Sequence, residues 1–385
     1  MNNPNHNRTG AITLKLNDFK LERYFAQYEF SARYLLCCSD CESYSIREIL
    51  DLDPDNERAF LESRLGYTES KGSPELRKQI AGLYEMCSAQ DILVHSGAEE
   101  AIFNFMNVAL EPGDHVIVQA PCYQSLQELP AAIGCEVSLW ELQPGVDGWE
   151  LDMDFLSGAI KKNTRAIIIN SPHNPTGHLL SRQEQKEIIE ICRANKILLF
   201  ADEVYRYLEY REEDRLPWAC DLYEGAVSLG VMSKSFGLPG LRIGWIATRN
   251  RSIMNKMSAF KDYTSICNSA PSEFLATIAL RHYQQIAGRN LQIIRENLDY
   301  IKPFLHEHRK LLTWIPPQAG PIAFPCLNAG VAIEEIARRL VADHGVLILP
   351  GSCYGVDKPH FRLGFGRRNF KSGWDEFQNY IEISI

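Results

Sequence analysis

Four short apolar runs of the sequence are each followed at once by small or polar residues that can do chemistry. These residues are Gly97, Ala98 and Glu99 after ILVHS, Asn174 in SPHNPTG, Asp202 at the end of KILLFAD, and Lys234 with Arg242 after AVSLGVM. Small residues at the start of a helix leave backbone N–H groups free to bind a phosphate. The other side chains supply an amide, a carboxylate, an amine and a guanidinium, which can bind anions and transfer protons.

Each of these residues also has an ordinary structural explanation. An Asn-Pro pair usually marks a turn, an aspartate at the end of a strand often caps a helix, and a lysine there usually lies at the surface. The order and spacing of the set favour a shared site instead, because Asn174, Asp202 and Lys234 are 28 and 32 residues apart and follow successive strands. Open α/β sheets bind their ligands at the carboxyl ends of the strands.

The apolar runs alternate with helical patterns between residues 90 and 250, which predicts an α/β fold with an open, mostly parallel sheet. Several runs are almost continuously apolar, as expected of strands that are covered on both faces. The expected strands are 92–97, 115–120, 135–142, 165–170, 196–202, 226–232 and 244–249. Helices are expected at 98–110 and 181–195, the second with Ser181 as its N-cap.

The two ends of the chain differ from this central region. Apolar residues recur at helical spacing through residues 251–311, and a compact α+β segment follows, with strands near 320–327 and 360–365. Residues 16–35 predict a helical arm that runs into a loop. We therefore expect an N-terminal arm at 1–60 that forms part of a small domain, a large ligand-binding domain at 61–285, and a small α+β domain at 286–385.

Composition argues against several classes of protein. The net charge of −9 and the pI near 5.7 disfavour nucleic acid as a partner, because phosphate binding needs clustered Lys and Arg. No run of 18 apolar residues is present, so no membrane span is expected, and residues 1–10 read as a disordered tail rather than a secretion signal.

Eleven cysteines are spread along the chain, and their odd number indicates reduced thiols in the cytoplasm rather than disulfides. Three of them lie in the cluster CCSDC at 37–41, which could in principle contribute to a zinc site. A four-ligand zinc site needs a second Cys/His pair at short spacing, and none stands out in the sequence. We therefore expect no metal.

The stretches SPHNPTG, ADEVYRYL and SKSFGLPGLRIGW resemble the sequence marks of fold-type I pyridoxal-phosphate enzymes, the class I/II aminotransferase superfamily, and the resemblance runs from about Leu65 to the C-terminus. It implies the aspartate aminotransferase-like fold and pyridoxal 5′-phosphate as cofactor. It also implies that Lys234 forms the Schiff base and then moves protons at the substrate Cα, and that Asp202 pairs with the pyridine nitrogen. Asn174 and Tyr205 would hydrogen-bond the ring oxygen.

The resemblance extends to the groups around the ring. Tyr123, in APCYQSL, matches the aromatic residue that stacks on the ring face. The phosphate would contact the N–H groups of Gly97, Ala98 and Glu99, the Ser233 hydroxyl and the Arg242 guanidinium. Tyr67 matches a residue that reaches the phosphate of the neighbouring subunit, which implies a homodimer with shared active sites. Arg362, in HFRLGFG, matches the arginine that makes a bidentate pair of hydrogen bonds with the substrate α-carboxylate.

A narrower resemblance concerns the substrate. The segments LNDFKLERYF, CCSDCESYS, FKDYTSICNSAP, GPIAFP and HGVLILPG are similar to those of the hydroxyarginine cyclases, the group of capreomycidine synthase and the L-enduracididine-forming enzymes. Such an enzyme would remove the Cα proton, expel a side-chain hydroxyl and close a ring by addition of the guanidine, with the amino group retained. A carboxylate would hold the guanidinium, and the candidates are Glu22, which we rank first, Glu29, Asp40 and Glu42.

Two alternatives make different demands. A conventional aminotransferase would need a keto-acid acceptor, whereas a cyclase would turn over without one. A cofactor-sensing transcription regulator would need a basic DNA-binding domain before the aminotransferase part, and the roughly 60 residues before Leu65 are not basic. We therefore keep the aminotransferase as the alternative function.

Overall fold

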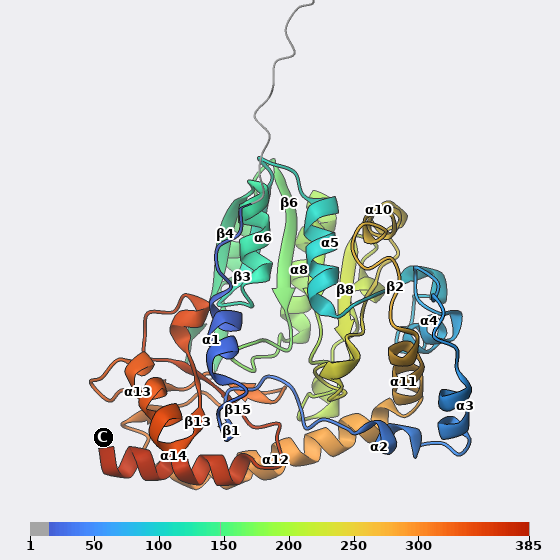
Figure 1. Cartoon of the computed structure of the whole chain (residues 1–385). Helices are drawn as coiled ribbons and strands as arrows, with labels where there is room; N and C mark the ends of the chain where they lie inside the picture. Colours follow the sequence, from blue (N-terminus) through green and yellow to red (C-terminus); the bar gives the residue numbers. More distant parts are fainter. Residues whose placement is uncertain (1–14, 147, 385) are drawn as a thin grey trace, which may run out of the picture.

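An eight-stranded sheet forms the centre of the computed structural model, which describes residues 15–146 and 148–384 (Figure 1). Its strands are, in spatial order, β2 (Ile92–His95), β9 (Gly244–Ala247), β8 (Ala226–Val231), β7 (Leu198–Asp202), β6 (Thr164–Asn170), β3 (His115–Ala120), β4 (Glu136–Pro144) and β5 (Trp149–Leu151). Neighbours pair in parallel from β8 to β4, whereas β9 runs antiparallel to β2 and β8, and β5 antiparallel to β4. The predicted α/β fold with a mostly parallel sheet is confirmed. The tail expected at residues 1–10 lies outside the described residues.

Helices cover both faces of this sheet. They are α4 (Pro74–Ala81), α5 (Ala98–Ala109), α6 (Ser125–Ile133), α7 (Met153–Gly158), α8 (Arg182–Asn195), α9 (Ala219–Leu222), α10 (Arg251–Lys261) and α11 (Ala270–Arg281). Successive side chains of a strand point to opposite faces, so Val116 and Val118 pack in one apolar cluster with α5, α6 and α10, and Ile117 packs in the other with α4, α8 and α11. Figure 1 shows α5 and α6 in front of the sheet and α8 behind it.

Local signals placed the two predicted helices well. Ser181 caps α8 by accepting the N–H of Glu184, and the Glu184 carboxylate accepts the N–H of Ser181 at 2.7 Å. The helix expected at 98–110 begins at Ala98, directly after Gly97. The helical region expected at 251–311 is divided into three helices, α10, α11 and α12 (Tyr283–Glu307), and Ser269 caps the second of them.

The two ends of the chain come together at the carboxyl edge of the sheet. Strand β1 (Tyr34–Leu35), which follows the arm helix α1 (Lys20–Tyr28), pairs in parallel with β13 (Val346–Leu347). The remaining elements of the two ends are α2 (Ile46–Leu50), α3 (Asn56–Glu62), β10 (Leu312–Thr313), β11 (Ile322–Ala323), β12 (Cys326–Leu327), α13 (Ile333–Arg339), β14 (Leu349–Pro350), β15 (Phe361–Gly364) and α14 (Phe370–Ser384). Figure 1 shows α12 and α14 side by side below the sheet, with α1 between them and the strand ends.

Helix α12 runs without a break across the domain boundary expected between residues 285 and 286. This boundary and the one expected at residue 60 stay predictions. Short helical turns connect the larger elements: η1 (Ala89–Asp91), η2 (Glu212–Asp214), η3 (Pro239–Leu241), η4 (Leu340–His344) and η5 (Gly351–Tyr354). Among the helices of the described ranges, none combines the length and the apolar character needed to cross a membrane.

Candidate active site

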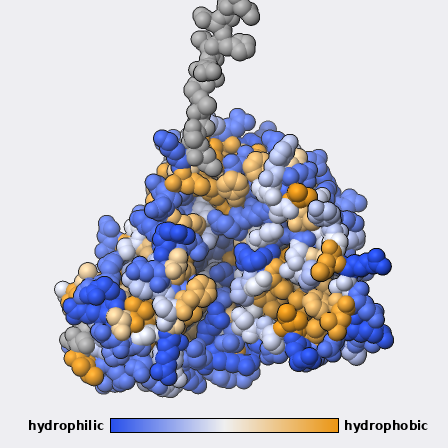
Figure 2. All heavy atoms as spheres, viewed as in Figure 1, coloured by the Kyte–Doolittle hydropathy of each residue, from blue (hydrophilic) through white to orange (hydrophobic). Residues whose placement is uncertain are grey.

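A cavity of about 410 Å³ lies between the carboxyl ends of β6, β7 and β8, the arm helix α1 and the segment 38–40. The face of the molecule in Figure 2 is hollowed near its centre. The predicted site residues that line the cavity are Glu22, Ala98, Glu99, Tyr123, Asn174, Asp202, Tyr205, Ser233, Lys234, Arg242 and Arg362. Residues separated by more than 300 positions in the chain therefore meet in one place; the order of the strand ends predicted this for Asn174, Asp202 and Lys234, and the family resemblance implied it for Glu22 and Arg362.

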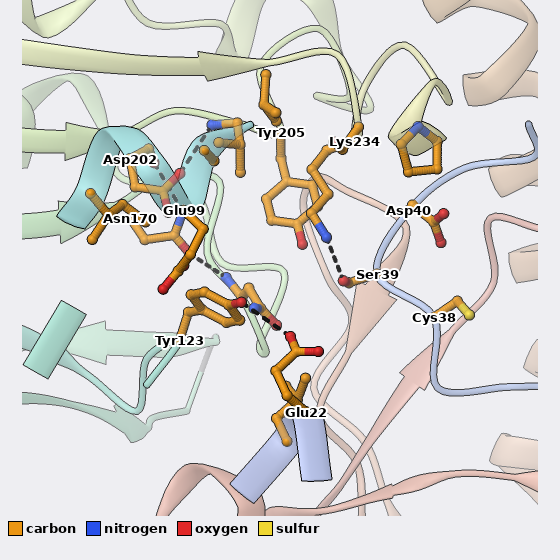
Figure 3. A pocket seen from close by; sticks show the side chains of 18 of the residues that line it. Glu22, Cys38, Ser39, Asp40, Glu99, Tyr123, Asn170, Asp202, Tyr205 and Lys234 are labelled. Atoms are coloured by element: carbon orange, nitrogen blue, oxygen red, sulfur yellow. Dashed lines mark hydrogen bonds between the residues drawn. The ribbon is translucent and has the colours of Figure 1, made fainter. Parts of the chain in front are cut away.

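Lys234 follows β8 and points its amine across the cavity (Figure 3). Its Nζ donates a hydrogen bond to Ser39 Oγ at 2.8 Å. Burial lowers the pKa of Lys234, and the nearby Asp40 carboxylate opposes that change. A buried amine with a lowered pKa is more often neutral, which is the state that attacks a carbonyl or removes a proton.

Asp202 ends β7 and is held in place from both sides. The Asn170 side chain donates to its backbone carbonyl at 2.9 Å, and its carboxylate accepts the N–H of Val204 at 3.2 Å. Burial raises the pKa of Asp202 to about 7, and the Lys234 charge opposes this. A positively charged ring nitrogen would stabilise a buried carboxylate of this kind, and the family resemblance implies such a partner.

Two hydrogen-bond donors near Lys234 lack an acceptor. The Tyr205 hydroxyl is buried and makes no hydrogen bond within the described residues, although the Ser39 hydroxyl lies close enough to affect its pKa. The Asn174 Oδ1 accepts from Tyr354 at 2.9 Å and from Arg362 at 3.2 Å, so its amide nitrogen is left to face the cavity. A ligand oxygen between Tyr205 and Asn174 would satisfy both donors.

The start of α5 and the Arg242 guanidinium form a cup for an anion. Gly97 has a φ of +90°, and a Cβ at this position would overlap Arg242 Nη2, so that only glycine permits the close approach. The Gly97 N–H itself donates to His95 O at 2.8 Å. Of the three N–H groups predicted to contact the phosphate, those of Ala98 and Glu99 are therefore the ones left at the helix terminus.

Two side chains complete this cup. Arg242 Nη1 donates to Ser233 Oγ at 3.4 Å and to Pro239 O at 3.1 Å. The Ser125 hydroxyl donates a hydrogen bond to the Glu99 carboxylate, and burial raises the pKa of Glu99. The cup, the unsatisfied Tyr205 hydroxyl, the buried Asp202 and the Lys234 amine together fit a ligand with a phosphate, a ring oxygen, a basic ring nitrogen and a carbonyl. Pyridoxal 5′-phosphate has these four features.

Arg362, on β15, is 1% exposed and lies beside Asn174. Its Nε donates to Cys37 O at 2.8 Å, and its Nη1 donates to Asn174 Oδ1 and to the Tyr354 hydroxyl. No bond from Nη2 is formed within the part of the chain that the structure describes, which leaves this nitrogen for a carboxylate. Tyr354 was not predicted, because nothing in LPGSCYG announces a contact with a residue on another strand.

The arm helix packs directly on Tyr123. The Tyr123 hydroxyl donates to Glu22 Oε1 at 3.2 Å (Figure 3). The ring centroids of Phe19 and Tyr123 are 5.0 Å apart. Burial raises the pKa of Tyr123 above its ordinary value, and the charges of Glu99 and Glu22 add to this effect. The arm therefore closes one side of the cavity, while the stacking role of Tyr123 stays a prediction.

The four carboxylates expected near a guanidinium occupy different environments. Asp40 accepts two hydrogen bonds from Arg367 Nη2 at 2.9 and 2.8 Å, and Glu42 accepts the Arg368 N–H outside the cavity. Glu22 and Glu29 line the cavity without a cationic partner among the described residues. Burial raises the pKa of Glu29, and the charges of Asp40 and Glu22 raise it further.

Two other predicted features remain, and of the cysteine cluster Cys38 lines the cavity. Tyr67 is 95% exposed and does not line it. The cysteines at 37, 38 and 41 are not gathered into a metal-binding group; within the described ranges the group found is Cys87, Cys220 and Asp221. Sequence reasoning also overlooked Ser39, because a serine among cysteines carries no spacing that relates it to Lys234.

Comparison with known proteins supports the same reading. The family model for aminotransferase class I and II matches residues 46–369. Capreomycidine synthase from Streptomyces vinaceus is 28% identical over 356 residues, which cover 91% of this chain and 88% of that protein. A PLP-dependent aminotransferase from Streptococcus suis 89-1591 superposes with a TM-score of 0.90 at 31% identity, over 96% of this chain and 98% of that one. The PLP-dependent cyclase OrfR superposes with a TM-score of 0.88 at 30% identity, over 97% and 99%.

Proposed function

The chain belongs to the class I and II aminotransferase family and is a pyridoxal-phosphate-dependent enzyme, and we propose that it cyclises a hydroxyarginine. In this reaction the side-chain hydroxyl leaves, a guanidine nitrogen adds in its place, and the amino group is retained, which gives a product of the capreomycidine or L-enduracididine type. The observation that carries the proposal is the acidic wall of the cavity, formed by Glu22, Glu29 and Asp40.

The charge of this wall favours a cationic side chain. Of its three carboxylates, Asp40 is neutralised by Arg367, and Glu22 and Glu29 have no such partner within the described part of the chain. An acidic substrate would be repelled by these groups, and an aromatic one would leave them unpaired. A guanidinium presents a planar fork of N–H donors that matches a carboxylate, and its charge compensates the wall.

The remaining residues would act on the amino-acid part of the substrate. Arg362 would hold the α-carboxylate through Nη2, which makes no hydrogen bond to the described residues, and Lys234 would take the proton from Cα. Asp202, which burial makes unusually basic, would keep the ring nitrogen of the cofactor protonated, with Asn174 and Tyr205 donating to its ring oxygen. Bound pyridoxal phosphate supplies the electron sink for the pair left at Cα.

We include a homodimer with shared active sites in this proposal. Tyr67 is 95% exposed and Leu65, two residues before it, is 85% exposed, so two large apolar or aromatic side chains of this segment face solvent and do not line the cavity. A second copy of the chain covering this surface would bring Tyr67 of one subunit toward the phosphate cup of the other. Light scattering of the purified protein tests the dimer.

The reaction is tested with β- and γ-hydroxyarginine and no keto acid. Mass spectrometry of the products should show loss of one water with all nitrogen atoms retained from one of the two substrates. Amino transfer to a keto acid is the second candidate function, because the neighbour at 31% identity is described as an aminotransferase. Keto-acid-dependent amino transfer with no water loss from either hydroxyarginine would replace the cyclase proposal.

A further inference from the structure

Ser39 is the hydrogen-bond partner of the Lys234 amine. The two side chains meet across the cavity with Nζ and Oγ 2.8 Å apart, and Figure 3 shows the lysine pointing at the serine. Among the described residues, Ser39 is the one hydrogen-bond partner of Lys234 Nζ. Ser39 is 9% exposed and lines the cavity beside Asp40, on the side opposite Tyr123.

The position of the Ser39 hydroxyl is set by a rigid segment. Arg362 Nε donates to the carbonyl of Cys37 at 2.8 Å, and the N–H of Glu42 donates to Gly366 O at 2.8 Å. The side chains of Cys37 and Cys41 are fully buried on either side of Ser39. Strong anchoring at both ends of a short segment keeps its hydroxyl in one place, as a proton relay requires.

The cyclisation needs a proton delivered to the leaving oxygen. Hydroxide is a poor leaving group, so the hydroxyl must depart as water, and Lys234 becomes the carrier of a proton as soon as it has taken one from Cα. We propose, resting on the cyclase function above, that Ser39 relays this proton from the Lys234 ammonium to the departing hydroxyl. Ser39 is thereby a catalytic residue for water loss and not for removal of the Cα proton.

The steps balance without any oxidant or further reactant. For a β-hydroxyl, the Cα–H bond breaks and its proton goes to Lys234, while its electron pair forms a Cα–Cβ double bond as the C–O bond breaks. Ser39 passes its own proton to the leaving oxygen and receives one from Lys234, so that water departs with the C–O pair. A guanidine nitrogen then bonds to Cβ, and the proton it loses returns to Cα through Lys234.

The other polar groups around the cavity are engaged in other contacts in the proposed complex, where the substrate guanidinium pairs with Glu29. The Asp40 carboxylate accepts from Arg367, and Glu22 accepts from Tyr123. Tyr205 faces the ring oxygen in the proposed complex, and burial raises its pKa, which makes it a weak acid. The hydroxyl of Ser39 is in direct contact with the nitrogen that carries the proton.

The first experiment separates the two proton steps. Exchange of the Cα hydrogen of L-arginine in D₂O, followed by NMR, reports removal of the Cα proton alone, because arginine has no hydroxyl to lose. Water loss from hydroxyarginine, followed by mass spectrometry, reports the relay. In Ser39→Ala we expect exchange within about threefold of wild type and water loss slower by about 10²-fold. Ser39→Thr restores the hydroxyl and should recover most of the rate, and Ser31→Ala, at an exposed site, is the control.

The second experiment uses the protein before the cofactor is added. Amine labelling of Lys234 at a series of pH values, measured by peptide mass spectrometry, gives the pH of half-labelling. Ser39 accepts a bond from Lys234 and so favours the ammonium form, and Ser39→Ala should therefore shift half-labelling to lower pH. Ser31→Ala should cause no shift.

Three results would overturn the relay. They are an unchanged labelling profile in Ser39→Ala, water loss at the wild-type rate, and an equal fall of exchange and water loss, which would place Ser39 in the Cα step or in folding. A wild-type enzyme that exchanges the Cα hydrogen of arginine but dehydrates neither hydroxyarginine would instead refute the proposed function itself, and the relay with it.

Discussion

The Arg242 guanidinium lies against the α-carbon of Gly97, in the space that a side chain at this position would fill. Gly97 has a positive φ and precedes the first residue of α5, so one residue both starts the helix and admits the arginine. The phosphate cup therefore depends on a missing Cβ as much as on a charged side chain.

Gly97→Ala should weaken cofactor binding by about 10-fold or more. The new methyl group would displace the Arg242 guanidinium, and hydrogen bonds to charged groups contribute about 1.5–3 kcal/mol. Absorbance titration of the apoenzyme with pyridoxal phosphate gives the affinity. Gly113→Ala is the matched control, because Gly113 has a φ of +88° but open space around its α-carbon. Equal loss of affinity in both variants would attribute the effect to backbone strain alone.

The apoenzyme should become less stable as the pH rises from about 4 to 7, in part because of Asp202. Burial raises the pKa of Asp202 to about 7, well above the value near 3.9 of an unfolded aspartate, so the folded state holds its proton where the unfolded state has lost it. This contribution is fully present below about pH 4 and is lost as the pH passes 7. It amounts to at most about 4 kcal/mol.

Asp202→Asn removes this part of the pH dependence. Melting temperatures of wild-type and variant apoenzyme between pH 4 and 8 should therefore differ in slope, with the wild type falling more steeply. The pKa of Glu203 is also raised to about 7 by burial, but Glu203 is present in both proteins, so their difference isolates Asp202. If the melting temperatures of the two proteins changed in parallel with pH, Asp202 would not titrate in this range.

Glu29→Gln should raise KM for hydroxyarginine by about 10-fold with little change in kcat. The amide keeps the shape of the side chain but removes the negative charge, and with it the charge-assisted hydrogen bond to the guanidinium. The raised pKa of Glu29 adds a pH test: substrate affinity of the wild type should fall as the pH drops through that pKa, and this acid limb should be absent from the variant. Steady-state kinetics from pH 5 to 8 measure both effects.

The control for Glu29 is Glu62→Gln, which removes a carboxylate from an exposed position of α3. Its KM should equal that of the wild type. The same comparison with Glu22→Gln tests the residue that the sequence ranked first. If Glu22→Gln raises KM and Glu29→Gln does not, the guanidinium pairs with the carboxylate that also accepts the Tyr123 hydroxyl.

Local patterns predicted the strands and helices that carry a strong signal. The run of three isoleucines at 167–169 is buried on both faces of the sheet, which explains why apolar residues occupy successive positions of this strand. Strand β5 has three residues and alternates buried and exposed positions, which is too short a pattern to separate from a loop. The break between α10 and α11 was missed, because helical periodicity continues on both sides of it.

The sequence by itself determined the class of the site, because Asp202 ends β7, Asn174 and Lys234 follow the ends of β6 and β8, and parallel strands bring their carboxyl ends to one edge. It also identified Arg362 and the acidic candidates, through motifs that are local in the chain. Which carboxylate stays unpaired, that Tyr354 holds Arg362, and that Ser39 meets Lys234 were decided only by the tertiary structure. These contacts join residues 8 to 195 positions apart, because the segments at 37–41 and 349–364 pack against the strand ends, and no spacing in the sequence encodes where such segments meet.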